Sequence, residues 1–400
     1  MKLRSERARL IDQHPALKTE IGRWPMEIGG VKRVLPFYAF PTELLCYNAN
    51  NGRLAMETRQ WELENGRKLN GSDPADAAVV RQILLDLDAK MTLALKEDLR
   101  KKGQMEPGVI SHDGIVINGN RRMAIIEELH REESTGRWTV LEAVRLPEEI
   151  SEKDLWKIEA GLQLSKGRVA EYHPVNELLK IKEGINRGLS PKEVAAAMYA
   201  WKVDEVKEAL QRLQLIERFL DFFGQPGNYG LIKKFGLAEY FIDIQKRLIA
   251  PARREGVNRR EEKERLGYAF ALIRAGILAQ SRGSTKRKGF THWDIRNLHK
   301  VFSDAHARGA FVERMQGAKD IRAVPVEEVI EDFQDAAEIL VMKEERDRPA
   351  RLIERAINAL ESIDMGSQHL FNQSVVEKVE RLLELATDIQ RQLAEGQSGQ

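Results

Sequence analysis

Cysteine, long apolar runs and a strong net charge are what this 400-residue sequence lacks. Cys46 is its only cysteine, which excludes an intramolecular disulfide and a cysteine-rich zinc site and favours a reducing compartment. No apolar run approaches the roughly 20 residues that a membrane-spanning helix needs. The charged start, Met1–Arg7, is not followed by an apolar run, so we expect no signal peptide. We therefore expect a cytoplasmic protein without a membrane partner.

The net charge of +2 is small for a chain of this length. A surface for nucleic acid must then be a local patch, because the chain as a whole does not attract polyanions. Apolar residues make up 42% of the sequence, which is enough to bury a core. The length predicts two to four domains.

The most informative stretch runs from Gly114 to Leu129 and reads as a strand, a turn and a helix. Ile115–Ile117 is β-branched, Asn118-Gly119 is a turn signal, and apolar residues then recur at helical spacing. Arg121 and Arg122 fall in the first helical turn. Unpaired backbone N–H groups, the helix dipole and two guanidinium groups favour a phosphate site there. A βα turn with surface arginines is the alternative.

The surrounding pattern predicts further elements of a small α+β domain. We expect strand-like or buried pieces at 34–40 and 44–47, a strand at 138–146, and a polar loop or lid at 57–72. Asp73-Pro74 is a helix start, and the helical period continues from there to Gly103 as one helix.

The stretch Gly119-Asn120-Arg121-Arg122, followed by Met123-Ala124, resembles the G-x-R-R-x-x-A box of the ParB/sulfiredoxin superfamily. The resemblance covers roughly residues 31–220 and implies an α+β domain that binds a nucleoside triphosphate, CTP or ATP. It implies that Gly119, Asn120, Arg121 and Arg122 contact the phosphates. The Asn-rich turn at Tyr47–Arg53 resembles the family's strand-exit box, which would place Asn51 and Arg53 beside the nucleotide. A simple Asn-Gly turn is the alternative.

The segment Ile158–Leu164 resembles the family's E-N-x-x-R segment, whose Glu and Asn hold the nucleotide's metal ion. Glu159 matches, and the resemblance makes it a ligand for Mg²⁺. Ala160 stands where Asn is expected and offers no oxygen, which a hard cation requires.

Residues 190–216 have the spacing of a helix-turn-helix. Ser190-Pro191-Lys192-Glu193 is a capping box that starts the first helix, and Asp204 caps the second. Acids at the start of the second helix repel phosphates, whereas four nearby residues favour DNA. These four are Lys202, Lys207, Gln211 and Arg212. A structural helical bundle is the alternative.

A second candidate surface for DNA lies between Ser281 and Lys300, which contains six Lys or Arg residues and one acidic residue, Asp294. Phe290 and Trp293 are interleaved with the basic residues, a pattern that suits contact with DNA phosphates and stacking on nucleobases. The candidate contacts are Lys286, Arg287, Lys288 and Arg296. The alternative is a basic loop whose aromatic residues belong to the core.

Apolar residues of the last predicted helix, from Val375 to Leu393, step by four and three. Such a stripe must pack on something. The neighbouring predicted helix at 351–363 and a second subunit compete as partners.

Together these patterns predict an α+β fold: a small mixed ParB/sulfiredoxin-like domain followed by a mostly α-helical remainder. The expected divisions are an N-terminal extension (1–30), the nucleotide-binding domain (31–168), a helix-turn-helix region (169–223), a helical domain with the basic segment (224–325), and C-terminal helices for dimer contact (326–400).

The expected function is that of a ParB-like, nucleotide-regulated DNA-binding homodimer of a plasmid, phage or defence system, with protein partners from the same operon. Sulfiredoxin chemistry needs a thiol where Asn120 stands, and an asparagine cannot act as a general base. Binding with weak or no NTP hydrolysis is the conservative interpretation. A ParB-like nuclease or NTP-dependent enzyme, and a non-hydrolysing structural adaptor, are the alternatives.

Overall fold

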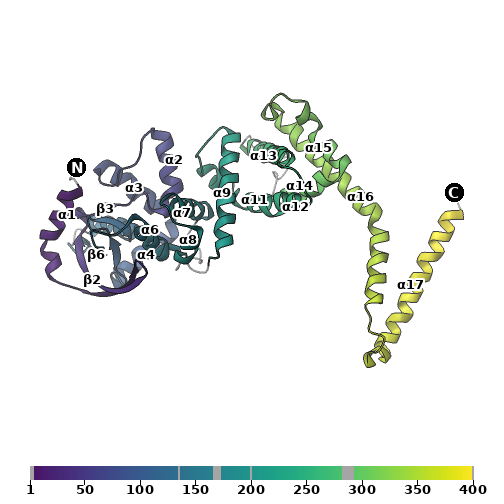
Figure 1. Cartoon of the computed structure of the whole chain (residues 1–400), viewed down its shortest axis with the longest axis horizontal. Helices are drawn as coiled ribbons and strands as arrows, with labels where there is room; N and C mark the ends of the chain where they lie inside the picture. Colours follow the sequence, from purple (N-terminus) through teal and green to yellow (C-terminus); the bar gives the residue numbers. More distant parts are fainter. Residues whose placement is uncertain (1–3, 134–135, 165–172, 199–200, 282–291, 399–400) are drawn as a thin grey trace. The chain divides into compact units, whose positions relative to one another are not determined.

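The computed structural model describes residues 4–133, 136–164, 173–198, 201–281 and 292–398. The chain forms two compact units, Met1–Phe333 and Gln334–Gln400. The first unit holds a mixed β-sheet near its N-terminus, followed by helices (Figure 1). The predicted fold class, an α+β domain with a mostly helical remainder, is confirmed.

The sheet has six strands in the order β1-β2-β6-β4-β5-β3. The strands are β1 (Gly22–Ile28), β2 (Val31–Pro41), β3 (Cys46–Tyr47), β4 (Gly108–Ile110), β5 (Ile115–Asn118) and β6 (Val140–Arg145). β1, β2 and β6 pair antiparallel, β6 and β4 pair parallel, β4 and β5 pair antiparallel, and β5 and β3 pair parallel. This topology brings the ends of β3 and β5 side by side, and both lead into the candidate site.

Residues before 31 belong to the sheet domain and are not a separate extension. β1 pairs with β2 along its whole length, and Ile11 of α1 (Arg4–Gln13) is fully buried in the core. A short 3₁₀ turn (η1, Pro15–Lys18) connects them. The sequence pattern hid β1 because Pro25 lies inside it; a proline is tolerated there because β1 is an edge strand.

Helices α2 to α6 surround the sheet. They are α2 (Ala55–Asn65), α3 (Pro74–Asp86), α4 (Ala89–Lys102), α5 (Asn120–Glu133) and α6 (Glu152–Leu164). The prediction of a loop from 57 to 72 was wrong for its first half, because α2 extends to Asn65; the helix buries only Met56 and Thr58, so its apolar period is weak. The predicted single helix to Gly103 is two helices, since the Asp88 side chain accepts the Met91 N–H and starts α4.

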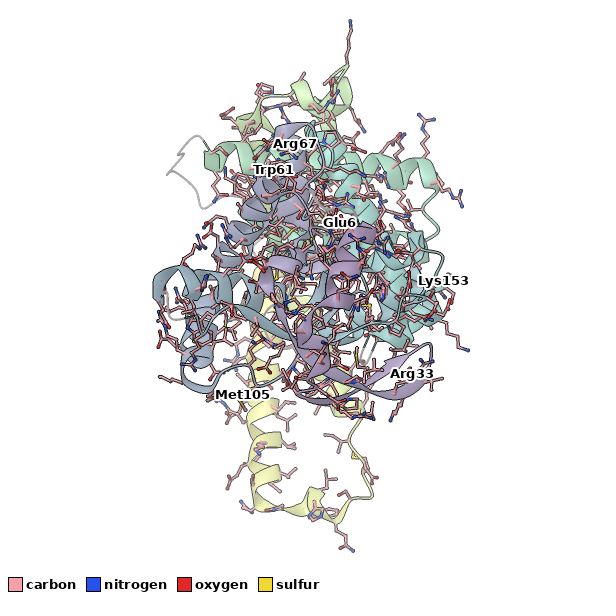
Figure 2. The ribbon with its side chains drawn as sticks, turned by 90° about the vertical axis from the view of Figure 1, so that its left-hand side faces the viewer. Glu6, Arg33, Trp61, Arg67, Met105 and Lys153 are labelled. Atoms are coloured by element: carbon pink, nitrogen blue, oxygen red, sulfur yellow. The ribbon has the colours of Figure 1, made fainter. Side chains whose placement is uncertain are left out.

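The turn that follows α2 is anchored to α3 by Arg67. Its guanidinium group donates to both oxygens of the buried Asp76, at 2.8 and 2.6 Å, and lies 4.7 Å from the centre of the Trp61 ring (Figure 2). The Asp76 carboxylate also accepts the Asn70 N–H, and these bonds hold the pKa of Asp76 below its usual value. The polar segment predicted as a lid is therefore tied down in its second half.

Two cores cover the two faces of the sheet. On one face, Phe40, Val116 and Leu141 pack against residues of α3, α4 and α5, including Leu84. On the other face, a smaller cluster contains Ile158 of α6. The site described below lies at the edge of the larger core.

The helical remainder of the first unit begins with α7 (Pro174–Asn186), α8 (Pro191–Ala197) and α9 (Val203–Phe223). It continues with α10 (Gly230–Lys234), α11 (Ala238–Asp243), the π-helical η4 (Ile244–Ile249), α12 (Ala250–Arg254), α13 (Arg259–Ser281), α14 (His292–Ser303) and α15 (Ala305–Gly317). The second unit comprises the later part of α16 (Val326–Glu361) and α17 (Gln373–Ser398). Among the described helices, none combines the length and apolar character needed to cross a membrane.

Candidate functional site

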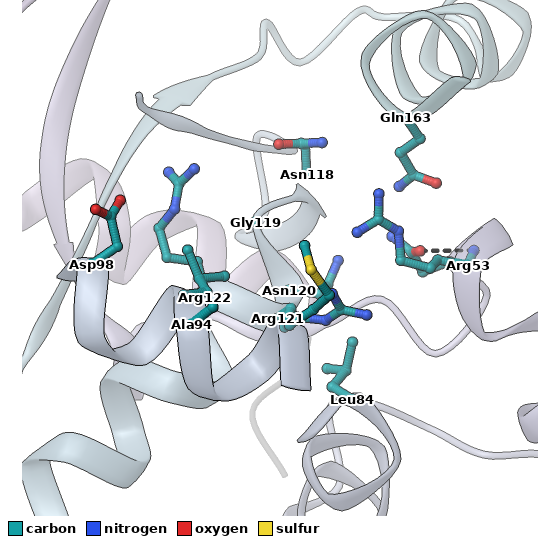
Figure 3. Close-up of a pocket in the computed structure, with 13 residues that line it drawn as sticks. Arg53, Leu84, Ala94, Asp98, Asn118, Gly119, Asn120, Arg121, Arg122 and Gln163 are labelled. Carbon is teal, nitrogen blue, oxygen red and sulfur yellow. Dashed lines mark hydrogen bonds between the residues drawn. The ribbon is translucent and has the colours of Figure 1, made fainter. Parts of the chain in front are cut away.

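A pocket of about 530 Å³ opens where the β5–α5 turn meets the segment after β3 and the helices α3 and α4 (Figure 3). It brings together the residues predicted to bind phosphates and the Asn-rich turn that follows Tyr47. Its lining comprises Asn51, Arg53, Leu84, Met91, Ala94, Leu95, Asp98, Asn118, Gly119, Asn120, Arg121, Arg122 and Gln163. The volume lies in the range of roughly 300–1,000 Å³ typical of small-molecule sites.

Gly119 makes the turn into α5. Its φ is +107°, a value that residues with a side chain rarely adopt, and a Cβ there would lie 3.4 Å from the Cα of Gly108. The turn aims the N-terminus of α5 at the pocket, and the first backbone N–H groups of a helix have no acceptor within the helix. The helix start therefore adds a favourable environment for an anion.

Three guanidinium groups and one carboxylate line the pocket, which leaves it positively charged. In Figure 3, Arg122 and Asp98 lie at one end, Arg53 and Gln163 lie at the other, and Arg121 lies between them. Arg122 also donates a hydrogen bond to the Glu106 carbonyl, and burial lowers the pKa of Arg122 despite the nearby Glu106. Arg122 thus joins α5 to the segment before β4, while the pocket keeps a net attraction for phosphate groups.

Two buried asparagines hold the pocket walls in place. The Asn120 side chain accepts the Asn48 N–H at 3.0 Å and donates to the Val116 carbonyl at 2.6 Å. The Asn51 side chain accepts the Arg53 N–H at 3.0 Å, the bond drawn in Figure 3. The Asn120 bonds fix the Asn-rich turn against β5 and the Asn51 bond stabilises the turn internally, so both asparagines act mainly as structural braces of the pocket.

Glu159 does not line the pocket; it lies behind the Asn-rich turn. Its carboxylate accepts the Gly52 N–H at 3.1 Å and is 2.7 Å from the fully buried Nζ of Lys180. Both of its oxygens are therefore engaged by the protein, and Ala160 offers no ligand. Within the described residues, no group of three His, Cys, Asp or Glu side chains is placed to hold a metal ion. The residues present do not fit the Mg²⁺ site that the family resemblance implies.

Helix α7 holds the end of the Asn-rich turn through hydrogen bonds. The side chain of Asn176, which is 2% exposed, accepts the Met56 N–H at 2.9 Å and donates to the Arg53 carbonyl at 2.8 Å. The Glu159–Lys180 pair makes a second link, since Lys180 also belongs to α7. A shift of Arg53 toward a ligand would therefore alter the hydrogen bonds that join this turn to α7.

Several pocket residues were not predicted from the sequence. Asp98 and the apolar wall formed by Leu84, Met91, Ala94 and Leu95 come from α3 and α4, and nothing local marks them as site residues. Gln163 follows Glu159 by four residues, so helical spacing places it one turn further along α6. Counted from Glu159, it also stands where the E-N-x-x-R segment has its arginine, so the motif could have identified it.

The helices predicted to form the helix-turn-helix are present as α8 and α9. However, α9 is 21 residues long and packs within the helical bundle along much of its length, with buried residues from Val206 to Leu220. Arg212 donates to the Gln245 side chain at 3.3 Å, and the Gln245 amide also reaches Gln211. Two of the four residues predicted to read DNA thus contact the π-helical segment.

The other predicted DNA contacts fall into three groups. Lys207 pairs with Asp204 of its own helix at 3.1 Å, and Lys202 precedes α9. Arg296 of α14 pairs with the buried Asp243 at 3.0 Å. The three consecutive bases 286–288 lie outside the described residues. The structure therefore brings together, in one pocket, the predicted phosphate-contact residues other than Glu159. Among the described candidates for DNA contact, Gln211, Arg212 and Arg296 are engaged by neighbouring side chains of the bundle.

Comparison of this chain with family models, with curated proteins and with solved structures found no match in any of the three.

Proposed function

We propose that the pocket binds a nucleoside triphosphate, CTP or ATP, and that nucleotide occupancy regulates DNA binding by the helical region. The observation that carries the proposal is the convergence of Arg53, Arg121 and Arg122 on the Gly119 turn at the start of α5. Guanidinium groups and a helix N-terminus are favourable partners for phosphate oxygens. The resemblance of Gly119–Arg122 to the ParB/sulfiredoxin box supports the same ligand.

The apolar wall suits the rest of the ligand. Leu84, Met91 and Leu95 offer a surface on which a nucleobase can lie, while the arginines hold the phosphates.

Hydrolysis is expected to be weak or absent. Asn120 has no basic group, and its amide already bonds Asn48 and Val116. The pocket carboxylate, Asp98, pairs with Lys102 at 2.6 Å. We therefore propose nucleotide binding as the main activity, with at most a slow NTPase reaction.

The link from the pocket to the helical region passes through α7. Asn176 bonds the Arg53 carbonyl just before α2 and the Met56 N–H in its first turn, and α7 packs on α8 and α9. A nucleotide that moves Arg53 toward the pocket would shift the equilibrium position of α7. Helix α7 would therefore connect nucleotide binding in the pocket to the position of α8 and α9. Regulated DNA binding of this kind fits the ParB-like plasmid, phage or defence systems inferred from the sequence.

Nucleotide binding to the purified chain tests the proposal. CTP and ATP should bind the wild type, and Arg121→Ala with Arg122→Ala should abolish binding while circular dichroism stays unchanged. Arg131→Ala is the matched control, because Arg131 lies on the same helix, is exposed and does not line the pocket. Undiminished nucleotide binding by the folded double variant would refute the assignment.

A non-hydrolysing structural adaptor is the second candidate. The contact of Gln211 and Arg212 with the buried Gln245 favours it, because these side chains are engaged by the helical bundle itself. A DNA titration at several salt concentrations separates the two functions. Salt-dependent DNA binding that changes with nucleotide supports the regulator, and its absence supports the adaptor.

We also propose that the second unit makes a homodimer contact. Apolar side chains of both of its helices are exposed, so packing of the two helices on each other, the alternative to a second subunit, does not bury them. The exposed set includes Leu352, Ile353, Ile357 and Leu360 of α16 and Val376, Val379, Leu382, Ile389 and Leu393 of α17. An exposed apolar stripe of this extent favours a protein partner, and a second copy supplies the same stripe.

A further inference from the structure

A second hollow lies in the helical part of the first unit, between α13 and the α14–α15 corner. Its volume is about 520 Å³. Three arginines line it: Arg260 and Arg265 of α13, and Arg308 of α15. Phe302 and Tyr268 form its aromatic side. None of the sequence motifs pointed to this hollow.

Arg265 is the unusual member of the lining. Its side chain is 9% exposed, and its Nε and Nη2 groups donate to the same oxygen of Glu261, at 3.2 and 2.6 Å. The guanidinium group lies 5.4 Å from the centre of the Phe302 ring. Its Nη1 atom is buried and finds no hydrogen-bond acceptor within the described part of the chain. A buried N–H group without an acceptor is unfavourable, so Nη1 has a free binding capacity at the edge of the hollow.

The charges around the hollow favour an anion. Three guanidinium groups face two carboxylates, Glu261 and Glu264, and Glu264 is paired with Arg260 at 3.2 Å. Glu255 lines an adjoining hollow and lies 3.1 Å from His299. Arg308 is exposed and has no ion pair within the described residues. One positive charge therefore remains in excess at the hollow itself.

We propose that this hollow binds a phosphate group through Arg265 Nη1 and Arg308. The two donors come from different helices, which suits a tetrahedral oxyanion that accepts hydrogen bonds in several directions. A planar carboxylate is better matched by the two parallel donors of one guanidinium edge, and the Nε–Nη2 edge of Arg265 is already taken by Glu261. The phosphate belongs either to a free phosphate monoester or to the backbone of a nucleic acid.

Inorganic phosphate is the probe for the site. The melting temperature of the full chain is measured in phosphate and in chloride at equal ionic strength. The measurement uses the background with Arg121→Ala and Arg122→Ala, so that phosphate in the nucleotide pocket does not contribute. We expect phosphate to raise the melting temperature in this background and to lose that effect on adding Arg308→Ala.

Lys263→Ala is the matched control, because Lys263 lies on α13, is exposed and lines neither hollow. Arg265→Lys keeps the positive charge but lacks Nη1, and it should also lose the phosphate effect. Equal melting temperatures in phosphate and chloride, or a full phosphate effect with Arg308→Ala, would overturn the proposal. Because Arg308 is exposed, its variant is expected to fold, so a negative result remains interpretable.

Fluorescence anisotropy with a short duplex DNA then distinguishes the two sources. If Arg308→Ala weakens DNA binding and Lys263→Ala does not, the site holds a nucleic-acid phosphate. If both variants bind DNA as the wild type does, and glycerol 3-phosphate reproduces the stabilisation by phosphate, the site holds a free monoester. If DNA binding is unchanged and glycerol 3-phosphate has no effect, the proposed phosphate site is wrong.

Discussion

Replacing Asn176 tests how strongly α7 holds the Asn-rich turn at Tyr47–Arg53. In Asn176→Ala, the Met56 N–H and the Arg53 carbonyl both lose their partner, and both lie at a position where Asn176 is almost fully buried. Each buried backbone group left without a partner costs about 1–3 kcal/mol. Some water access at the edge of the pocket reduces the total, so we expect a loss of about 2–4 kcal/mol in the free energy of unfolding.

Thermal unfolding followed by circular dichroism measures this loss. Asn176 lies in the unit Met1–Phe333, for which 1 kcal/mol lowers the melting temperature by about 1.4 °C, so the variant should melt roughly 3–6 °C below the wild type. Asn186→Ala is the control, because Asn186 lies on the same helix and is exposed. Nucleotide affinity should fall in Asn176→Ala as well, since Arg53 is held less firmly.

Asn176→Asp separates the two hydrogen bonds. It keeps an oxygen for the Met56 N–H but cannot, when ionised, donate to the Arg53 carbonyl. We expect it to weaken nucleotide binding as Asn176→Ala does. If Asn176→Ala melts within about 2 °C of Asn186→Ala, the bonds from α7 contribute little and the reasoning is refuted.

Three further outcomes are expected. Substituting Lys286, Arg287 and Lys288 with Ala should weaken DNA binding for all sequences and flatten its salt dependence, because fewer counterions are released; an unchanged affinity and salt slope would contradict a phosphate contact there. Full-length chain should sediment as a dimer at micromolar concentration and a chain ending at Asn372 as a monomer; if both are monomers, or both dimers, α17 is not the dimer contact. Hydrogen bonds from the Ser190 backbone N–H and hydroxyl, with Lys157 nearby, lower the pKa of Glu193 to about 2. Ser190→Ala keeps the backbone donor but removes the hydroxyl, so NMR titration should show a partial rise of that pKa, and no rise would mean that the hydroxyl contributes nothing.

Local sequence determined the strand, turn and helix at the centre of the site. β-Branched residues, Asn118-Gly119 and the helical period that follows act within a few residues of one another, and the structure has β5, the turn and α5 at those positions. Helix starts were predictable for the same reason, because Asp73 and Ser190 accept N–H groups of their own first turns. Weak or interrupted patterns misled the interpretation, as with β1, α2 and the break at Asp88.

The other features of the pocket, namely its apolar wall, its bonds to α7 and the environment of Glu159, depend on which helices pack together. The apolar wall from α3 and α4, and the bonds from Asn176, join residues that are far apart in the sequence. Glu159 shows the same limit, because its match to a family motif suggested a metal ligand, whereas packing places it against the buried Lys180. A side chain's hydrogen-bond capacity is set by its type, but the partner that uses this capacity is decided by the tertiary structure.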